Sequence, residues 1–204
     1  AISLPELRRG YSGLLGNPVF VGYAILTGTS LGAVFAFLTA GPFIFINNFG
    51  VATQDFGLYY LFIVASYILG SFLIHRVAHV VDPTRSLWFG VTMALVGAGL
   101  VMWLVQTGLE SPLTITIGMC LMFFGAGPVF AIAPSKALDA TVNRVGYAAA
   151  LLGCAELAVG GVAAAVITVL HDETSMPLAI TLMGLAGSAV VVLWFVGRCE
   201  RKSI

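Results

Sequence analysis

Six long apolar stretches alternate with short polar connections along the chain. They cover residues 19–46, 56–74, 86–107, 112–134, 145–170 and 176–197. A helix needs about 20 mostly apolar residues to cross a bilayer, and the strict alternation expected of membrane β-strands is absent. Because backbone groups in lipid must be paired within the segment, the pattern predicts an all-α integral membrane bundle of six helices. Residues 1–18 are expected to form a linker and residues 198–204 a tail.

Charged residues are confined almost entirely to the connections, and the basic ones occur only in alternate connections. Basic side chains occur before the first stretch, after the second, after the fourth and after the last. The nine are Arg8, Arg9, Arg76, Arg85, Lys136, Arg144, Arg198, Arg201 and Lys202. The other connections carry only the acidic Asp55, Glu110, Asp172 and Glu173. Since basic residues favour the cytoplasmic side, both termini are predicted to be cytoplasmic.

Composition supports the membrane assignment and argues against several functional classes. Of 204 residues, 59% are hydrophobic and only 9% are charged, against roughly 25% charged in soluble domains. The basic residues serve as topology markers, so no nucleic-acid partner is expected. The sequence has no nucleophile–base pair, phosphate loop or metal cage, and we predict no enzyme activity, cofactor or metal site. His75 and His79 share a helical face, but packing at the membrane interface is the favoured role.

A short internal similarity links the first and fourth stretches. TAGPFIFI at 39–46 matches GAGPVFAI at 125–132 in alanine, glycine, proline and the final isoleucine. The two stretches cross the membrane in opposite directions, as in a 3+3 inverted repeat. Proline removes a helical hydrogen bond, so Gly41–Pro42 and Gly127–Pro128 are expected to kink their helices. The kinks serve either gating or packing alone.

Glu156 is an acidic residue in the middle of the fifth apolar stretch, within GCAELAVGG. A charge at this depth costs roughly 3 kcal/mol or more. Its helical neighbours are mostly small, and no Lys or Arg in the stretches lies at matching depth. We interpret Glu156 as a protonatable carboxyl that faces a cavity and binds a proton or a cationic group. The alternative is a protonated side chain that hydrogen-bonds to a neighbouring helix.

Further polar and aromatic residues are candidates for supporting roles. Thr27 is a polar residue of the first stretch, and Tyr67 is deep enough to need a hydrogen-bond partner. Phe37 and Phe43 offer apolar contacts for a substrate. Arg76, Asp82 and Arg85, in GSFLIHRVAHVVDPTRSLWFG, form either a charge latch between helices or a simple topology marker.

Three segments carry a family resemblance: LPELRRGYSGLLGNPVFVGYAI, AFLTAGPFIFINNFGVATQDFGLYY and GYAAALLGCAEL. They resemble the second half of the bicyclomycin/chloramphenicol-resistance (Bcr/CflA) transporters, twelve-span drug/proton antiporters of the major facilitator superfamily. The resemblance implies spans seven to twelve in a bacterial inner membrane. It also implies that the second and fifth helices line the seam between halves, with Gly146, Gly153 and Gly160 as small seam residues. Glu156 departs from the family, which commonly has Gln there.

The resemblance implies half of a proton-coupled transporter that exports small amphipathic drug-like compounds by alternating access. Its partners are the lipid bilayer, protons, a small-molecule substrate and either an N-terminal six-span half or a second copy. Two alternatives stay open: a six-span membrane binding or assembly subunit, and a major facilitator importer of a nutrient or siderophore. The linker-like start without methionine favours a segment of a longer protein.

Overall fold

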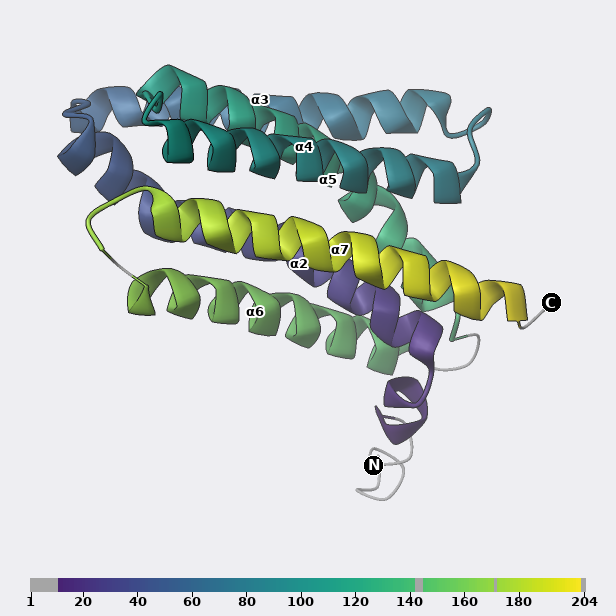
Figure 1. Ribbon diagram of the computed structural model, residues 1–204. Coiled ribbons are helices and arrows are strands. Elements are labelled where there is room, and N and C mark those ends of the chain that lie inside the picture. Colours follow the sequence, from purple (N-terminus) through teal and green to yellow (C-terminus); the bar gives the residue numbers. More distant parts are fainter. Residues whose placement is uncertain (1–10, 142–144, 171, 203–204) are drawn as a thin grey trace.

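The computed structural model describes residues 11–141, 145–170 and 172–202 and is helical almost throughout (Figure 1). Six of its helices are long and apolar enough to cross a membrane, which confirms the predicted all-α architecture. The elements are α2 (Pro18–Pro42), the π-helix η1 (Phe43–Asn48), α3 (Thr53–Val77), α4 (Pro83–Thr107), α5 (Pro112–Asp139), α6 (Val145–Val169) and α7 (Met176–Lys202).

Local sequence signals define where three of the helices begin. Asn17, Asp82 and Ser111 cap α2, α4 and α5 with side-chain oxygens that accept backbone N–H bonds, and each is followed by a proline at the first helical position. A cap followed by proline is a favoured helix start, because the lost N–H would be unpaired there. Gly108, with a left-handed φ of 68°, ends α4, as expected for a helix C-terminus.

Two helices, α2 and α5, occupy the centre of the bundle and contact each other. α6 packs mainly on α2 and α3 mainly on α5, while α7 packs on α2 and α4 on α5. If α2, α3 and α4 exchange places with α5, α6 and α7, the α2–α6 contact becomes the α5–α3 contact, and the α2–α7 contact becomes the α5–α4 contact. This symmetry agrees with the predicted 3+3 repeat. The start of α2, the α3–α4 connection and the C-terminus lie at one end of the bundle (Figure 1).

Glycines bring α4 and α5 into close contact at two levels. Gly90 lies against Gly125, and one helical heptad further along α4, Gly97 lies against Gly118. A Cβ atom on Gly97 would lie only 2.5 Å from the Met122 nitrogen and 2.7 Å from the Gly118 oxygen. Since these neighbours are backbone atoms, no side-chain rotation can relieve the overlap. Small residues allow this kind of close packing, which drives helix association where the hydrophobic effect does not act.

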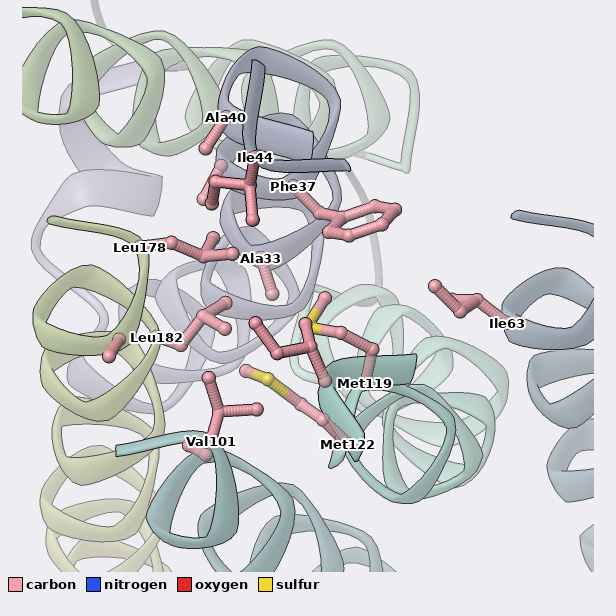
Figure 2. Packing of buried hydrophobic residues seen from close by; sticks show 14 of the residues in the cluster. Ala33, Phe37, Ala40, Ile44, Ile63, Val101, Met119, Met122, Leu178 and Leu182 are labelled. Carbon is pink, nitrogen blue, oxygen red and sulfur yellow. The ribbon is translucent and has the colours of Figure 1, made fainter. Parts of the chain in front are cut away.

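Two apolar clusters fill the bundle, one toward each end. The cluster near η1 includes Phe37, Ile44, Ile63, Met119 and Leu182 (Figure 2), which are 0 or 1% exposed. The other surrounds Phe20, Tyr23, Leu87 and Val196 near the termini. Side chains from at least five helices contribute to each cluster, so the isolated chain has a packed interior of its own.

The structure places the end of the last helix later than expected and shows a π-helix directly after Pro42. α7 extends through Lys202, so most of the expected tail is helical, because the charges after Gly197 mark the end of the apolar stretch and not of the helix. Pro42 is the last residue of α2, and the chain continues as η1. π-Helical turns are rare and frequently occur at functional sites. In α5, by contrast, the helix is continuous through Gly127, Pro128 and Pro134.

Candidate functional site

α3 and α6 are the helices least covered by the rest of the bundle. In their most apolar windows only 17% and 22% of residues are buried, against 61% in α5. The two helices lie at opposite sides of the bundle (Figure 1), and each packs mainly on one central helix. They are the second and fifth spans, so their positions match the two helices that the family resemblance assigns to the seam.

The outward side of α6, hereafter the α6 open face, consists largely of small side chains. It comprises Gly146, Ala149, Ala150, Gly153, Cys154, Ala158, Gly161 and Ala165, together with the larger Leu157 and Val162. The exposed Val145, Thr168 and Val169 lie at the two ends of the helix, outside this set. A Cβ atom on Gly146, Gly153 or Gly161 would meet nothing within 4 Å. Gly160 differs, because a Cβ there would collide with the ring of Phe35 on α2. Two of the three expected seam glycines therefore lie on the open face, and the third packs inside the bundle.

Glu156 lies at the border between the α6 open face and the packed side of α6. Leu152, Gly160 and Ala163, close to it on the helix, are buried, whereas the side chain of Glu156 is half-buried. Next to it, Val159 fits against Gly28 and Gly32 of α2. Among the described residues Glu156 has no hydrogen-bond or ion-pair partner. The carboxyl is thus at the edge of the α6 open face and available to a group that approaches from outside the described chain.

Two residues expected to contact substrate, Thr27 and Phe37, are in the interior. Both side chains are 0% exposed. The Thr27 hydroxyl donates to the Tyr23 carbonyl oxygen of its own helix at 2.9 Å. Phe37 stacks on Tyr60 with ring centroids 6.1 Å apart and contacts Phe45 at 6.0 Å. In this conformation a substrate reaches neither of them, so both are corrected from contact residues to core residues.

The other two candidates, Phe43 and Tyr67, are half-buried and lie on different parts of the bundle. Phe43 borders a hollow of about 310 Å³ between the η1 end of α2, the end of α6 and the start of α7. Tyr67 packs edge-on against Phe130 of α5 at 5.9 Å. Since Glu156 packs beside α2, the structure does not bring Tyr67 and Glu156 together.

Of the two roles expected for Arg76, Asp82 and Arg85, the charge latch is not formed among the described residues. The Asp82 carboxylate accepts the backbone N–H groups of Thr84 at 2.8 Å and Arg85 at 3.2 Å. These bonds, that of Arg85 foremost, hold the pKa of Asp82 below its ordinary value. The guanidinium of Arg76 instead lies 5.0 Å from the centre of the Phe72 ring. Asp82 therefore serves as a helix cap, because its short side chain reaches its own helix before it reaches an arginine.

A polar cluster at the termini end of the bundle was not predicted from the sequence. The Tyr23 hydroxyl donates to Glu200 Oε1 at 2.8 Å, and Lys136 Nζ lies 3.5 Å from the same oxygen. The Lys136 ammonium also lies 5.6 Å from the Tyr23 ring centre. This cluster joins α2, α5 and α7 beside a cavity of about 590 Å³ that His75 and Asp139 also line. No sequence spacing indicates it, since its members are far apart along the chain.

The described residues contain no group of three His, Cys, Asp or Glu side chains close enough to hold a metal ion. His75 is exposed, and the carboxylate of the nearby Asp82 is committed to the start of α4. The polar features of the site are therefore single carboxyl, hydroxyl and basic groups. Such groups bind protons, cations or hydrogen-bonding parts of an organic molecule.

The chain is similar to bacterial transport proteins over nearly its whole length. It is 27% identical over 207 residues to a bicyclomycin resistance protein homolog of Haemophilus influenzae, an alignment covering 99% of this chain and 50% of that protein. It is also 27% identical to an uncharacterized MFS-type transporter of Bacillus subtilis, YdgK, across 81% of this chain, and to multidrug resistance protein D of Escherichia coli across 93%. No protein-family profile matches the chain. The chain spans about half the length of the curated relatives it matches.

Proposed function

We propose that this multi-pass membrane chain, a half-length homologue of the major facilitator transporters related to bicyclomycin resistance proteins, forms one half of a proton-coupled exporter. The cargo class that we propose is small amphipathic drug-like molecules, because two relatives are named for resistance to bicyclomycin and to multiple drugs. The complementary half is a second set of six spans, or a second copy of this chain.

The observation that carries the proposal is the α6 open face. Small residues at a helix surface permit close approach of another helix, and this face has no partner within the described chain. The alignments reach only half of each relative, so the missing half supplies a natural occupant. Transport then consists of rocking the two halves against each other around a site near the middle of the membrane.

Glu156 is the residue that we propose for proton or cation binding. A carboxyl at mid-membrane depth is costly unless it is neutralised or solvated, and Glu156 has no partner among the described residues. Its place at the edge of the α6 open face gives it access to the space between the halves. A proton or a cationic substrate neutralises the charge of Glu156. In this proposal, that neutralisation couples binding at the seam to the movement of the halves.

Both termini are proposed to be cytoplasmic. The described basic residues Arg76, Arg85, Lys136, Arg198 and Arg201 belong to helix ends or a connection at one end of the bundle. That end also carries the C-terminus (Figure 1). Since an excess of Lys and Arg favours the cytoplasmic side, this end supports the proposed orientation.

The test is Glu156→Gln in the transporter completed by its other half. Removing the titratable group while keeping size and polarity is expected to flatten the dependence of export on external pH. Glu156→Asp, which keeps the carboxyl, serves as the matched control and should retain a pH-dependent profile. Glu110→Gln, in the loop between α4 and α5, controls for charge removal elsewhere. Identical pH profiles and substrate ranges for wild type and Glu156→Gln would remove the coupling role.

A further inference from the structure

A groove of about 400 Å³ lies between α4 and α7, away from the α6 open face. Thr84 and Trp88 line it from α4, and Trp194, Gly197, Arg198 and Arg201 line it from α7. The α4 pair is four residues apart, and the α7 residues recur at spacings of three and four, so each set forms a stripe on one helix face. The groove is therefore a continuous feature of two packed helices.

The groove is open along its α7 side. A Cβ atom built on Gly197 would meet nothing within 4 Å, so no part of the described chain fills the space above this glycine. Trp194 is 49% exposed, and the guanidinium of Arg198 lies flat against it, 3.6 Å from the ring centre. This contact fixes the positive group at the entrance of the groove.

Both arginines of the groove lack an acidic partner within the described chain. No described carboxylate lies within 4.0 Å of Arg198 or Arg201. Glu200 borders the same groove, but its Oε1 accepts from Tyr23 and pairs with Lys136. The groove therefore offers two exposed guanidinium groups to a ligand, next to a carboxylate whose charge is already balanced.

An apolar groove of about 450 Å³ adjoins this site on the other side of α7. Leu15, Ile25, Val191 and Phe195 are among its lining residues, and Trp194 lines both grooves. An amphipathic molecule can therefore place a charged end beside the arginines and an apolar chain along α7. Tryptophan residues at this level are typical of the boundary between headgroups and hydrocarbon.

We propose that the α4–α7 groove binds an anionic diacyl glycerophospholipid of the surrounding bilayer. Its phosphate contacts Arg198 and Arg201, since guanidinium groups bind phosphate oxygens in pairs, and one acyl chain follows α7 past Trp194 into the apolar groove. Basic pockets between membrane helices are suited to such headgroups. The site is separate from the transport seam and requires only that the chain is embedded in a membrane.

The experiment uses the purified 204-residue chain, stripped of lipid and offered equal amounts of dioleoyl phosphatidylglycerol and dioleoyl phosphatidylcholine. Native mass spectrometry counts the bound lipids. The wild type is expected to retain phosphatidylglycerol preferentially, because only that headgroup carries a net negative charge. The double variant Arg198→Gln/Arg201→Gln is expected to bind it roughly 10- to 30-fold more weakly. Arg76→Gln, another exposed arginine resting on an aromatic ring, should keep the preference.

A second variant separates loss of the site from loss of the fold. Gly197→Leu adds a side chain at a position where a Cβ atom would meet nothing within 4 Å, and it should reduce phosphatidylglycerol binding while thermal unfolding stays unchanged. Gly187→Leu, on the same helix and equally unobstructed, should bind as the wild type does. Equal retention of the two lipids, or an unchanged preference in both groove variants, would overturn the proposal. Displacement of the lipid by an equal concentration of free glycerol phosphate would assign the site to a soluble phosphate and overturn the lipid assignment.

Discussion

The α4–α5 interface and the α6 open face both consist of glycine and other small residues, yet they stand in opposite situations. Gly97 is enclosed by the backbone of the facing helix, whereas a Cβ atom on Gly153 or Gly161 would meet nothing within 4 Å. The first pattern holds two helices of one chain together. The second is a similar surface on which no helix of the described chain packs.

This difference separates what stabilises the chain from what the chain offers to another protein. The exposed sides of α4 and α7 carry large side chains, among them Phe89, Trp103, Trp194 and Phe195, beside single open glycines such as Gly99 and Gly187. The α6 open face has mainly alanine and glycine in the same kind of exposed position. Since small surfaces favour close helix contact, the composition of this face supports the proposal that a second half docks there.

The largest expected effect comes from enlarging a glycine inside the α4–α5 interface. Gly97→Leu forces the two helices apart, because its Cβ would already overlap backbone atoms of Met122 and Gly118. Overpacking of this kind costs about 1–3 kcal/mol or more, so we expect a strongly reduced yield of monodisperse protein and a lower unfolding temperature in detergent. Gly161→Leu, on the open face, should leave both measurements unchanged. Equal destabilisation by the two substitutions would contradict the contrast.

A second substitution tests the open face itself. Gly153→Leu should leave the isolated chain folded, but it should weaken association with the complementary six-span half, because the leucine occupies the space of the approaching helix. Co-purification of the two halves measures the effect, with Gly187→Leu on the lipid side of α7 as the control. Association that is as strong for Gly153→Leu as for Gly187→Leu would show that the second half docks elsewhere.

The smallest expected effect concerns the start of α4. The folded-state pKa of Asp82 lies below its ordinary value. The ionised carboxylate therefore stabilises the start of α4 fully at any pH above the ordinary pKa, and this stabilisation is lost as the pH falls through the folded-state pKa. Amide exchange at Thr84 and Arg85 should therefore lose protection on acidification in the wild type. Asp82→Asn keeps a capping oxygen without a titratable group and should show no acid-dependent loss beyond the intrinsic exchange rate. Parallel behaviour of both proteins would assign the cap no titrating role.

The helices and their approximate places could be predicted from the sequence, whereas their mutual contacts could not. Runs of apolar residues are local signals that locate the helices, whereas the caps at Asn17 and Asp82 were not predicted and are seen only in the structure. The burial of Thr27 and Phe37 depends on which helix faces which, and no local pattern encodes that. The π-helix after Pro42 could not be predicted either, because a proline indicates that the helix is disturbed but not what kind of irregularity follows.

The ionic contacts between helices also could not be predicted from the sequence. Arg76, Asp82 and Arg85 are close in the sequence, and this proximity makes them the natural candidates for a latch. The ion pair present among the described residues instead joins Lys136 to Glu200, which are brought together only when α5 and α7 end at the same level of the bundle. A seam position for Glu156 is implied by the family resemblance and stays a prediction, whereas its place at the border of the α6 open face is visible only in the packed structure.

Cysteine labelling at the α6 open face tests the central claim most directly. Cys154 is exposed on this face, two positions from Glu156, and replacing Cys120 and Cys199 by serine leaves it as the single thiol. A detergent-soluble maleimide should label Cys154 rapidly in the chain alone and slowly once the complementary six-span half is bound. Equal labelling rates in the two states, with the complex shown to be intact, would contradict the assignment of the α6 open face to the seam between halves.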